Sequence, residues 1–140
     1  MPTELFLIDT SAWIFALRKN FVVQIKERVD SLLKDDVILT TGLIKLELLG
    51  GTRTQKEFYR LKNRLAVLEE IEINTVLWES SFELAFTLRR KGVTVPYTDI
   101  IIAACALNAN AILVHADSHF DLISNHSSLR VESYVDIVQG

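Results

Sequence analysis

Four acidic residues stand in or at the ends of apolar segments, where a charge is costly to place: Asp9, Glu47, Asp99 and Asp117. Carboxylates packed together repel one another unless they are protonated or neutralised by cations. Oxygen-only ligands without cysteine suit hard ions such as Mg²⁺ or Mn²⁺. Such a site polarises a phosphodiester and lowers the pKa of bound water, so that water attacks at neutral pH without a protein nucleophile. These four residues, which we call the acidic site, are therefore candidates for metal-assisted hydrolysis.

Each of these acids also has an ordinary structural explanation. Asp9 follows the apolar run 5–8 and can simply cap a helix. Asp99 stands in the first turn of an expected helix, where the helix dipole favours an acid. Glu47 can be a partly exposed residue of a short helix; if it is buried it needs a cation or hydrogen-bond partners, because desolvating its charge is costly. Four independent accidents that converge on one edge are a weaker explanation than a shared site.

The elements that must position these acids follow from the hydrophobic pattern. We expect strands over 5–8, 37–40, 70–74 (edge-like), 111–114 and 129–133, and helices over 12–17, 21–34, 41–51, 54–68, 75–91 and 97–107, with a closing turn or strand end over 134–138. This alternation predicts right-handed crossovers and a parallel sheet covered on both faces. The carboxyl ends of its strands then share one edge, where ligands bind in open α/β sheets.

Length and composition limit the function classes. The 140 residues predict one domain over 1–140, and 49% hydrophobic with 24% charged residues excludes a disordered chain. No apolar run approaches the roughly 20 residues of a membrane helix. The N-terminus lacks the basic start of a signal peptide, and the single cysteine, Cys105, fits a reducing compartment, so we expect a cytoplasmic protein. The net charge of −3 argues against a protein that grips nucleic acid by bulk electrostatics, but not against an enzyme whose acids hold cations.

Two helical segments carry side chains that suggest partners. The most basic window of the chain lies in and just before the segment 54–68: Arg53, Lys56, Arg60, Lys62 and Arg64. A solvated helix face is its commoner meaning, and a phosphate-contacting surface is the alternative. In the segment 75–91, Trp78, Phe82 and Phe86 share one stripe. Such a stripe favours a core or an interface over a stacking platform for bases.

The motifs together resemble a known family. Asp9-Thr-Ser, an isolated Glu47, Tyr97-Thr-Asp99-Ile-Ile-Ile-Ala-Ala and Val114-His-Ala-Asp117-Ser-His-Phe follow one another as in PIN domains, above all in the VapC toxins of bacterial and archaeal toxin–antitoxin pairs. The resemblance spans nearly the whole chain. It implies a single-domain, three-layer α/β/α fold with a five-stranded parallel sheet, and a Mg²⁺- or Mn²⁺-dependent endoribonuclease. It also implies a homodimer that a VapB-like antitoxin wraps and blocks.

The resemblance assigns roles by position. Four acids match the family's acidic metal ligands: Asp9, Glu47, Asp99 and Asp117. Ser11, or Thr10, matches the polar residue that supports the first acid. Asp121 lies near the site at a position that varies in the family. His115 stands where a threonine is commoner, and this change affects the hydrogen bonding around the ligands.

Other functions remain open at this point. The acids can be remnants in a non-catalytic PIN-like module that binds a protein, or the chain can be a PIN ribonuclease of RNA processing with no antitoxin. A transition-metal site is a third possibility, since imidazole suits Zn²⁺ or Ni²⁺. Its ligands would be His115, Asp117, His119 and Asp121. This alternative leaves the distant acids unexplained.

A phosphatase or phosphoacceptor domain with Asp9 as its nucleophile is a further alternative. Position 11 argues against it, because it holds serine instead of the second aspartate of an Asp-x-Asp motif. The sequence has no glycine-rich phosphate loop and no serine or cysteine elbow motif. Metal-assisted hydrolysis of RNA is therefore the function that the sequence favours.

Overall fold

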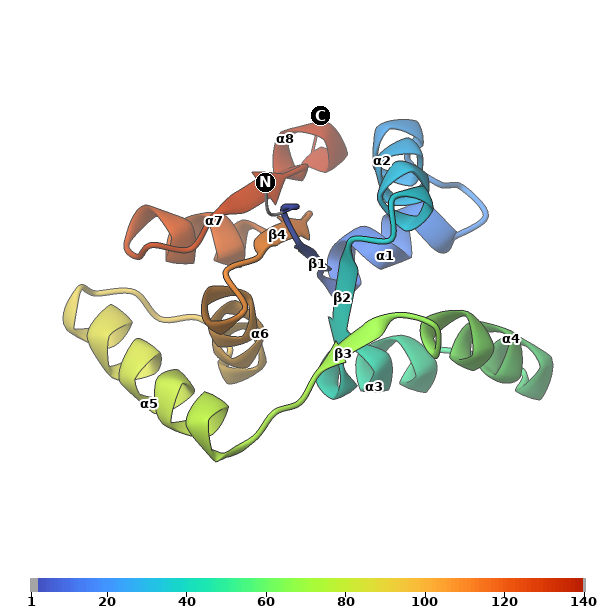
Figure 1. Ribbon diagram of the computed structural model, residues 1–140. Coiled ribbons are helices and arrows are strands. Elements are labelled where there is room, and N and C mark those ends of the chain that lie inside the picture. The colour runs from blue at the N-terminus through green and yellow to red at the C-terminus, as the bar shows by residue number, and fades with distance from the viewer. Residues whose placement is uncertain (1–2, 140) are drawn as a thin grey trace.

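The computed structural model describes residues 3–139, in which strands and helices alternate along the chain (Figure 1). The strands are β1 (Phe6–Ile8), β2 (Ile38–Thr41), β3 (Glu69–Ile71), β4 (Ile112–His115) and β5 (Val131–Ser133). The helices are α1 (Thr10–Leu17), α2 (Val23–Lys34), α3 (Gly42–Gly50), α4 (Gln55–Leu65), α5 (Thr75–Arg90), α6 (Tyr97–Asn108), α7 (Ser118–Asn125) and α8 (Val135–Gln139).

The strands form one five-stranded sheet in the order β3-β2-β1-β4-β5, and every neighbouring pair is parallel. The central strand β1 pairs with β2 through Phe6 and Ile38, and with β4 through Phe6 and Ile112. Helices flank the sheet on both sides: α5, α6 and α7 lie to its left in Figure 1, and α1, α2 and α4 lie to its right. The predicted α/β/α architecture with a five-stranded parallel sheet is confirmed.

The core is centred on the two middle strands. Leu7 and Ile8 of β1 and Leu113 and Val114 of β4 have no exposed surface. Strands that are covered on both faces favour such continuous apolar runs over alternation. Cys105, on α6, is also fully buried, and burial raises the pKa of its thiol to about 11, so it packs as a small apolar residue. Of the helices within residues 3–139, none combines the length and hydropathy needed to span a membrane.

Several elements differ from the prediction in type or in their bounds; for example, α4 ends at Leu65 and not at 68, and β5 begins at Val131 and not at 129. The polar stretch after β4 leads into a helix, α7, that was not predicted from the sequence. The Asp117 side chain caps this helix by accepting the N–H of His119. The closing segment is the helix α8 and not a turn or strand end. β3 ends at Ile71, before the predicted 74, because Asn74 caps α5.

The aromatic stripe of α5 is not part of the core. Trp78, Phe82 and Phe86 are 44%, 58% and 64% exposed. The side of α5 that packs inward is formed by other residues: Leu77, Ser81 and Leu88. The core interpretation of the stripe is therefore wrong, and its alternative as an interface stays a prediction.

Candidate functional site

The site is built where two adjacent strands end. Asp9 directly follows β1, and Asp117 follows β4 by two residues. These strands are in register at Ile8 and Val114, and the Asp9 N–H donates to the Val114 carbonyl at 2.9 Å. Each aspartate is also the N-cap of the next helix, α1 or α7. Strand pairing and helix capping thus fix both carboxylates at the same edge of the sheet, as the sequence predicted.

Ser11 ties the first acid to the neighbouring strand. Its hydroxyl donates to Asp9 Oδ2 at 2.5 Å, and its backbone N–H donates to the same oxygen at 2.9 Å. The Ser11 hydroxyl in turn accepts from the Ala116 N–H at 3.0 Å. Asp9 is only 4% exposed, and its Oδ1 accepts no hydrogen bond from any of the residues described. Ser11 therefore orients one carboxylate oxygen and leaves the other available to a ligand.

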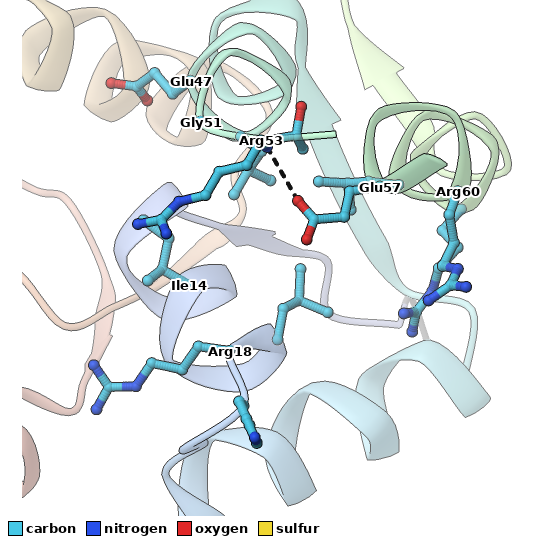
Figure 2. A pocket seen from close by; sticks show the side chains of 13 residues that line it. Ile14, Arg18, Glu47, Gly51, Arg53, Glu57 and Arg60 are labelled. Carbon is cyan, nitrogen blue, oxygen red and sulfur yellow. Dashed lines mark hydrogen bonds between the residues drawn. The ribbon is translucent and has the colours of Figure 1, made fainter. Parts of the chain in front are cut away.

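Glu47 approaches the site from an exposed position. Its Oε1 accepts from the Thr10 hydroxyl at 2.6 Å, so it lies beside the residue that follows Asp9. Figure 2 shows Glu47 at one edge of the side chains that line a cleft. Its apolar neighbours do not enclose it, since Leu46 is itself 69% exposed. Glu47 is therefore exposed and not buried, and its role as a metal ligand stays a prediction.

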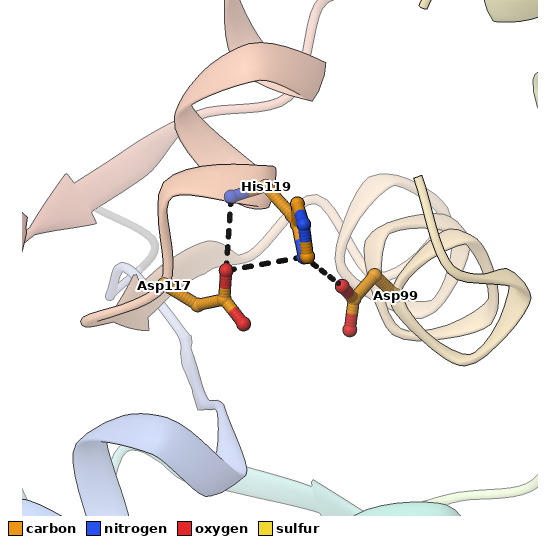
Figure 3. Close-up of side chains that lie close together, drawn as sticks. All are labelled: Asp99, Asp117 and His119. Carbon is orange, nitrogen blue, oxygen red and sulfur yellow. Dashed lines mark hydrogen bonds and ion pairs between the residues drawn. The ribbon is translucent and has the colours of Figure 1, made fainter. Parts of the chain in front are cut away.

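The carboxylates of Asp99 and Asp117 both contact the imidazole of His119, a residue that was not among the predicted acidic metal ligands. His119 Nδ1 lies 3.0 Å from Asp99 Oδ2 and 3.2 Å from Asp117 Oδ1 (Figure 3). Because an ionised carboxylate only accepts hydrogen bonds, we assign the hydrogen to Nδ1. The ligand atoms of the three residues all lie within 4.8 Å of one another. The sequence suggested His119 only for a transition-metal site, because its contact with Asp99 depends on long-range packing.

The charges of these acids act on one another. Burial raises the pKa of Asp9 to about 6, and the Asp99 and Glu47 charges add to this rise, whereas the hydrogen bonds from Ser11 oppose it. Burial, followed by the charge of Asp117, also raises the pKa of Asp99, and the contact with His119 opposes that rise. This pattern is typical of carboxylates brought together to share a cation.

Asp121 turns away from this group. Its Oδ2 accepts from the Ser133 hydroxyl at 2.9 Å, and its Oδ1 lies 3.2 Å from His115 Nε2. His115 is fully buried, which lowers the pKa of its imidazole, and its Nδ1 accepts from the Asp117 N–H at 3.2 Å. Within the described chain, only two residues of the proposed transition-metal set, Asp117 and His119, join one cluster. Asp121 and His115 instead contact each other, and His115 also binds the backbone of the loop that carries Asp117.

The donor set fits a hard divalent ion. Asp9 and Asp117 lie at the ends of the adjacent strands β1 and β4, and Asp99 of α6 clusters with Asp117 and His119. Asp9 and Glu47 do not belong to this cluster, but their charges act on it, and the pKa values of Asp9 and Asp99 are both raised. Carboxylate oxygens suit Mg²⁺ and Mn²⁺, and the single imidazole of His119 is compatible with Mn²⁺. The single cysteine of the sequence, Cys105, is buried and does not belong to this cluster, so the site has no soft thiolate ligand.

A basic cleft adjoins the acidic site. Its volume is about 820 Å³, and α1, α3 and α4 with the loop 51–53 enclose it. We call it the basic cleft because five cationic side chains line it: Arg18, Lys19, Arg53, Arg60 and Arg64. Two acids, Glu47 and Glu57, line it as well. The basic window of the sequence is therefore divided, since Lys56 and Lys62 are not among the lining residues.

Comparisons with known proteins agree with this geometry. The model of the PIN domain matches residues 6–125. Over 134 residues the chain is 28% identical to the VapC ribonuclease Mb1587 of Mycobacterium bovis, which covers 93% of this chain and 99% of that protein. The solved VapBC2 of Rickettsia felis, bound to promoter DNA, is similar with a TM-score of 0.77 at 22% identity, covering 93% of this chain and 98% of that one. DNA-bound VapBC of Salmonella typhimurium gives a TM-score of 0.75 at 21% identity, covering 94% and 98%. With most of its length matched by the family model, this chain belongs to the PIN domain family.

Proposed function

We propose that this protein is a metal-dependent endoribonuclease that hydrolyses RNA phosphodiester bonds, and that it is the VapC-like toxin of a toxin–antitoxin pair. The observation that carries the proposal is that Asp9 and Asp117 follow adjacent strands at one edge of the sheet, where Asp99 clusters with Asp117 and its charge acts on Asp9. The names of its curated relatives, VapC ribonucleases that match over nearly their whole length, support the same activity.

In this proposal Asp9, Asp99 and Asp117 hold Mg²⁺ or Mn²⁺, with Glu47 and His119 beside them. When bound, the ion supplies a Lewis acid for the phosphodiester and activates water for attack. The chain's own contribution is position: Ser11 orients Asp9 through Oδ2, and the N–H of His119 orients Asp117 through Oδ1. Such supporting hydrogen bonds keep ligands in the geometry that a small, strict ion requires.

His119 contributes a proton at a defined atom. Its Nδ1–H lies between the carboxylates of Asp99 and Asp117 and offsets part of their repulsion. The side chain is 43% exposed, so it is free to move aside when the carboxylates bind a ligand. In the proposed enzyme the Nδ1–H of His119 therefore bridges the two carboxylates when no ion is bound.

The proposal includes a protein partner. Solved neighbours of this fold are VapBC assemblies, and we expect a VapB-like antitoxin to cover the site of this chain in the cytoplasm. We also expect a homodimer. The exposed aromatic stripe of α5 (Trp78, Phe82 and Phe86) is an apolar surface available for either contact.

Cleavage of a mixed RNA pool tests the activity. Wild-type protein and Asp9→Asn, purified identically, are each incubated with the pool in EDTA, Mg²⁺ or Mn²⁺. Asparagine keeps the oxygen that caps α1 but removes the charge, so the fold is retained. We expect metal-dependent cutting by the wild type alone. Equal cutting by the variant, or cutting in EDTA, would identify a contaminating nuclease and contradict the proposal.

A further inference from the structure

We infer that the basic cleft holds the sugar–phosphate backbone of the RNA strand as the strand leads to the acidic site. The inference rests on the proposed ribonuclease function and identifies the surface that binds the RNA substrate of the enzyme. Five cations face two acids in this cleft, although the whole chain carries a net charge of −3. Positive charge is thus concentrated locally in an acidic protein, which is the electrostatic footprint of a polyanion site.

The cations of the basic cleft are free to bind a ligand. Within residues 3–139, none of the five takes part in an ion pair, whereas Arg28 and Arg130 pair with Glu132 and Glu4. The Arg18 guanidinium donates to the carbonyl of Asn20 at 2.8 Å and lies over the Phe15 ring, 4.4 Å from its centroid, and both contacts leave part of its edge for an anion. A set of unpaired guanidinium groups in one hollow repels itself until an anion enters, and guanidinium geometry matches phosphate oxygens.

Helical spacing explains which side chains reach the cleft. On α4, Glu57, Arg60, Leu61 and Arg64 recur at intervals of three and four residues and all line it. Glu57 faces inward because its carboxylate accepts the Arg53 N–H at 3.0 Å, next to the start of the helix. The Glu57 carboxylate is therefore engaged by a backbone N–H, while Arg60 and Arg64 stay exposed.

The cleft adjoins the acidic site at Glu47. This residue lines the cleft and accepts the Thr10 hydroxyl beside Asp9. Figure 2 shows that Arg18 and Arg53 extend toward the same side as the Glu47 carboxylate, while Arg60 lies at the opposite end of the cleft. A strand that lies along the cleft would therefore meet cations along its length and carboxylates at its end.

The lining also contains apolar surface that nucleotides can use. Ile14 is 48% exposed at the cleft, and Leu17, Leu48 and Leu61 complete its apolar part. Grooves that bind single strands combine cations along the backbone with contacts to sugar and base faces. A protein segment could also use the apolar part, but it offers no regular row of anions for five cations. The charge therefore favours RNA as the occupant.

Equilibrium binding in EDTA tests this inference without requiring catalysis. The probe is a fluorescein-labelled pool of single-stranded RNA of random sequence, roughly 20 nucleotides long so that it exceeds typical single-strand sites. Fluorescence anisotropy gives the Kd between about 50 and 200 mM salt for the wild type, Arg60→Gln/Arg64→Gln and the matched control Arg89→Gln/Arg90→Gln. The control removes the same charge from exposed arginines of α5 that do not line the cleft.

We expect the cleft variant to bind about tenfold more weakly, and the slope of log Kd against log salt to fall by about 1 to 2, because two phosphate contacts are lost. The control should bind like the wild type. In the cleavage assay the cleft variant should raise KM and leave kcat nearly unchanged. If the α4 variant misfolds, Arg53→Gln, whose side chain lies outside any helix, repeats the test.

Equal Kd and equal salt slope for the two double variants would overturn the inference and would favour a protein as the occupant. This failure differs from a failure of the proposed function. Wild-type protein that binds RNA through the cleft but never cuts it with Mg²⁺ or Mn²⁺ would refute the ribonuclease and leave the cleft as an RNA site. Metal-dependent cutting with equal binding by both variants would refute the cleft alone.

Discussion

The acidic site and the basic cleft share Glu47 but are built in opposite ways. The acids have short side chains held at strand ends and helix caps, and Asp9 is almost fully buried. The cations of the cleft have long, exposed side chains on helix surfaces and in a loop. Chemistry requires groups that are held within a fraction of an ångström, whereas attraction of a flexible polyanion requires charge that can adapt. The difference indicates that one region reacts and the other binds.

Removal of an acid should have the largest effect. Asp99→Asn deletes a charge that faces both Asp117 and His119. We expect the rate of RNA cleavage to fall by about a thousandfold, which corresponds to several kcal/mol of lost transition-state stabilisation. Multiple-turnover kinetics with Mn²⁺ measure this effect in kcat. The control Asp136→Asn, an exposed aspartate of α8, should cleave like the wild type. Full activity of Asp99→Asn would contradict a catalytic role for the acidic site.

Removal of the Ser11 hydroxyl, which donates a hydrogen bond to Asp9, should have a smaller effect. Ser11→Ala frees Asp9 Oδ2 from a hydroxyl donor and leaves the Ala116 N–H without its acceptor. We expect metal affinity, and with it cleavage at limiting Mn²⁺, to fall by about 10- to 100-fold. Excess Mn²⁺ should restore much of the activity. Ser128→Ala, at an exposed serine, provides the control. A loss that excess metal does not relieve would mean that Ser11 maintains the fold instead.

Neutralisation of the buried acid should stabilise the protein in EDTA. The pKa of Asp9 is raised from 3.8 to about 6, so between these values the folded state binds more protons than the unfolded state. The free energy of unfolding should therefore fall as pH rises through this window, and Asp9→Asn should remove that loss. At pH 7 we expect the variant to be more stable by about 1 to 3 kcal/mol.

Thermal or urea denaturation of both proteins in EDTA, from about pH 4 to about pH 7, measures this difference. The gain of the variant should grow with pH and should shrink when Mn²⁺ is added, because only the wild type gains from the ion. A gain that does not change with pH would contradict the electrostatic account of Asp9.

The smallest effect concerns the acid within the basic cleft. Glu57→Gln removes one of the two negative charges among the lining residues. RNA binding in EDTA should tighten by about twofold to threefold, with a steeper salt dependence. Glu79→Gln, at an exposed position of α5, should leave the Kd unchanged. Weaker binding by Glu57→Gln would show that the carboxylate matters for its hold on the Arg53 N–H and not for its charge.

The sheet could be predicted from the sequence because its strands are short apolar runs that end in turn or cap residues. The run before Asp9 and the run before His115 are buried on both faces, and this placed two acids at one edge. The parallel direction of the strands then followed from the alternation of strands and helices, whereas the strand order came only from the structure. α7 could not be predicted in the same way, because its first turn, Ser118 to Asp121, is rich in polar residues and its burial rests on Phe120 and Ile123 alone.

The side that a helix presents to solvent was harder to predict. Around Glu47 apolar residues occur on every face of α3, so the hydrophobic pattern did not indicate that Leu46 and Glu47 point outward. The stripe on α5 posed the converse difficulty, because Trp78 and Phe82 have the spacing of a core but are exposed. Long-range packing decides both cases. The contact of His119 with Asp99 also depends on it, since twenty residues separate the two.

Calorimetric titration of Mn²⁺ at about pH 6 tests the central claim most directly, because near its pKa Asp9 must release a proton to bind an ion. Wild-type protein is compared with Asp99→Asn in two buffers of different ionisation enthalpy. We predict saturable binding by the wild type with a heat that depends on the buffer, and greatly weakened binding by the variant. Absence of binding to the wild type, or equal binding to both proteins, would contradict a metal centre at the acidic site.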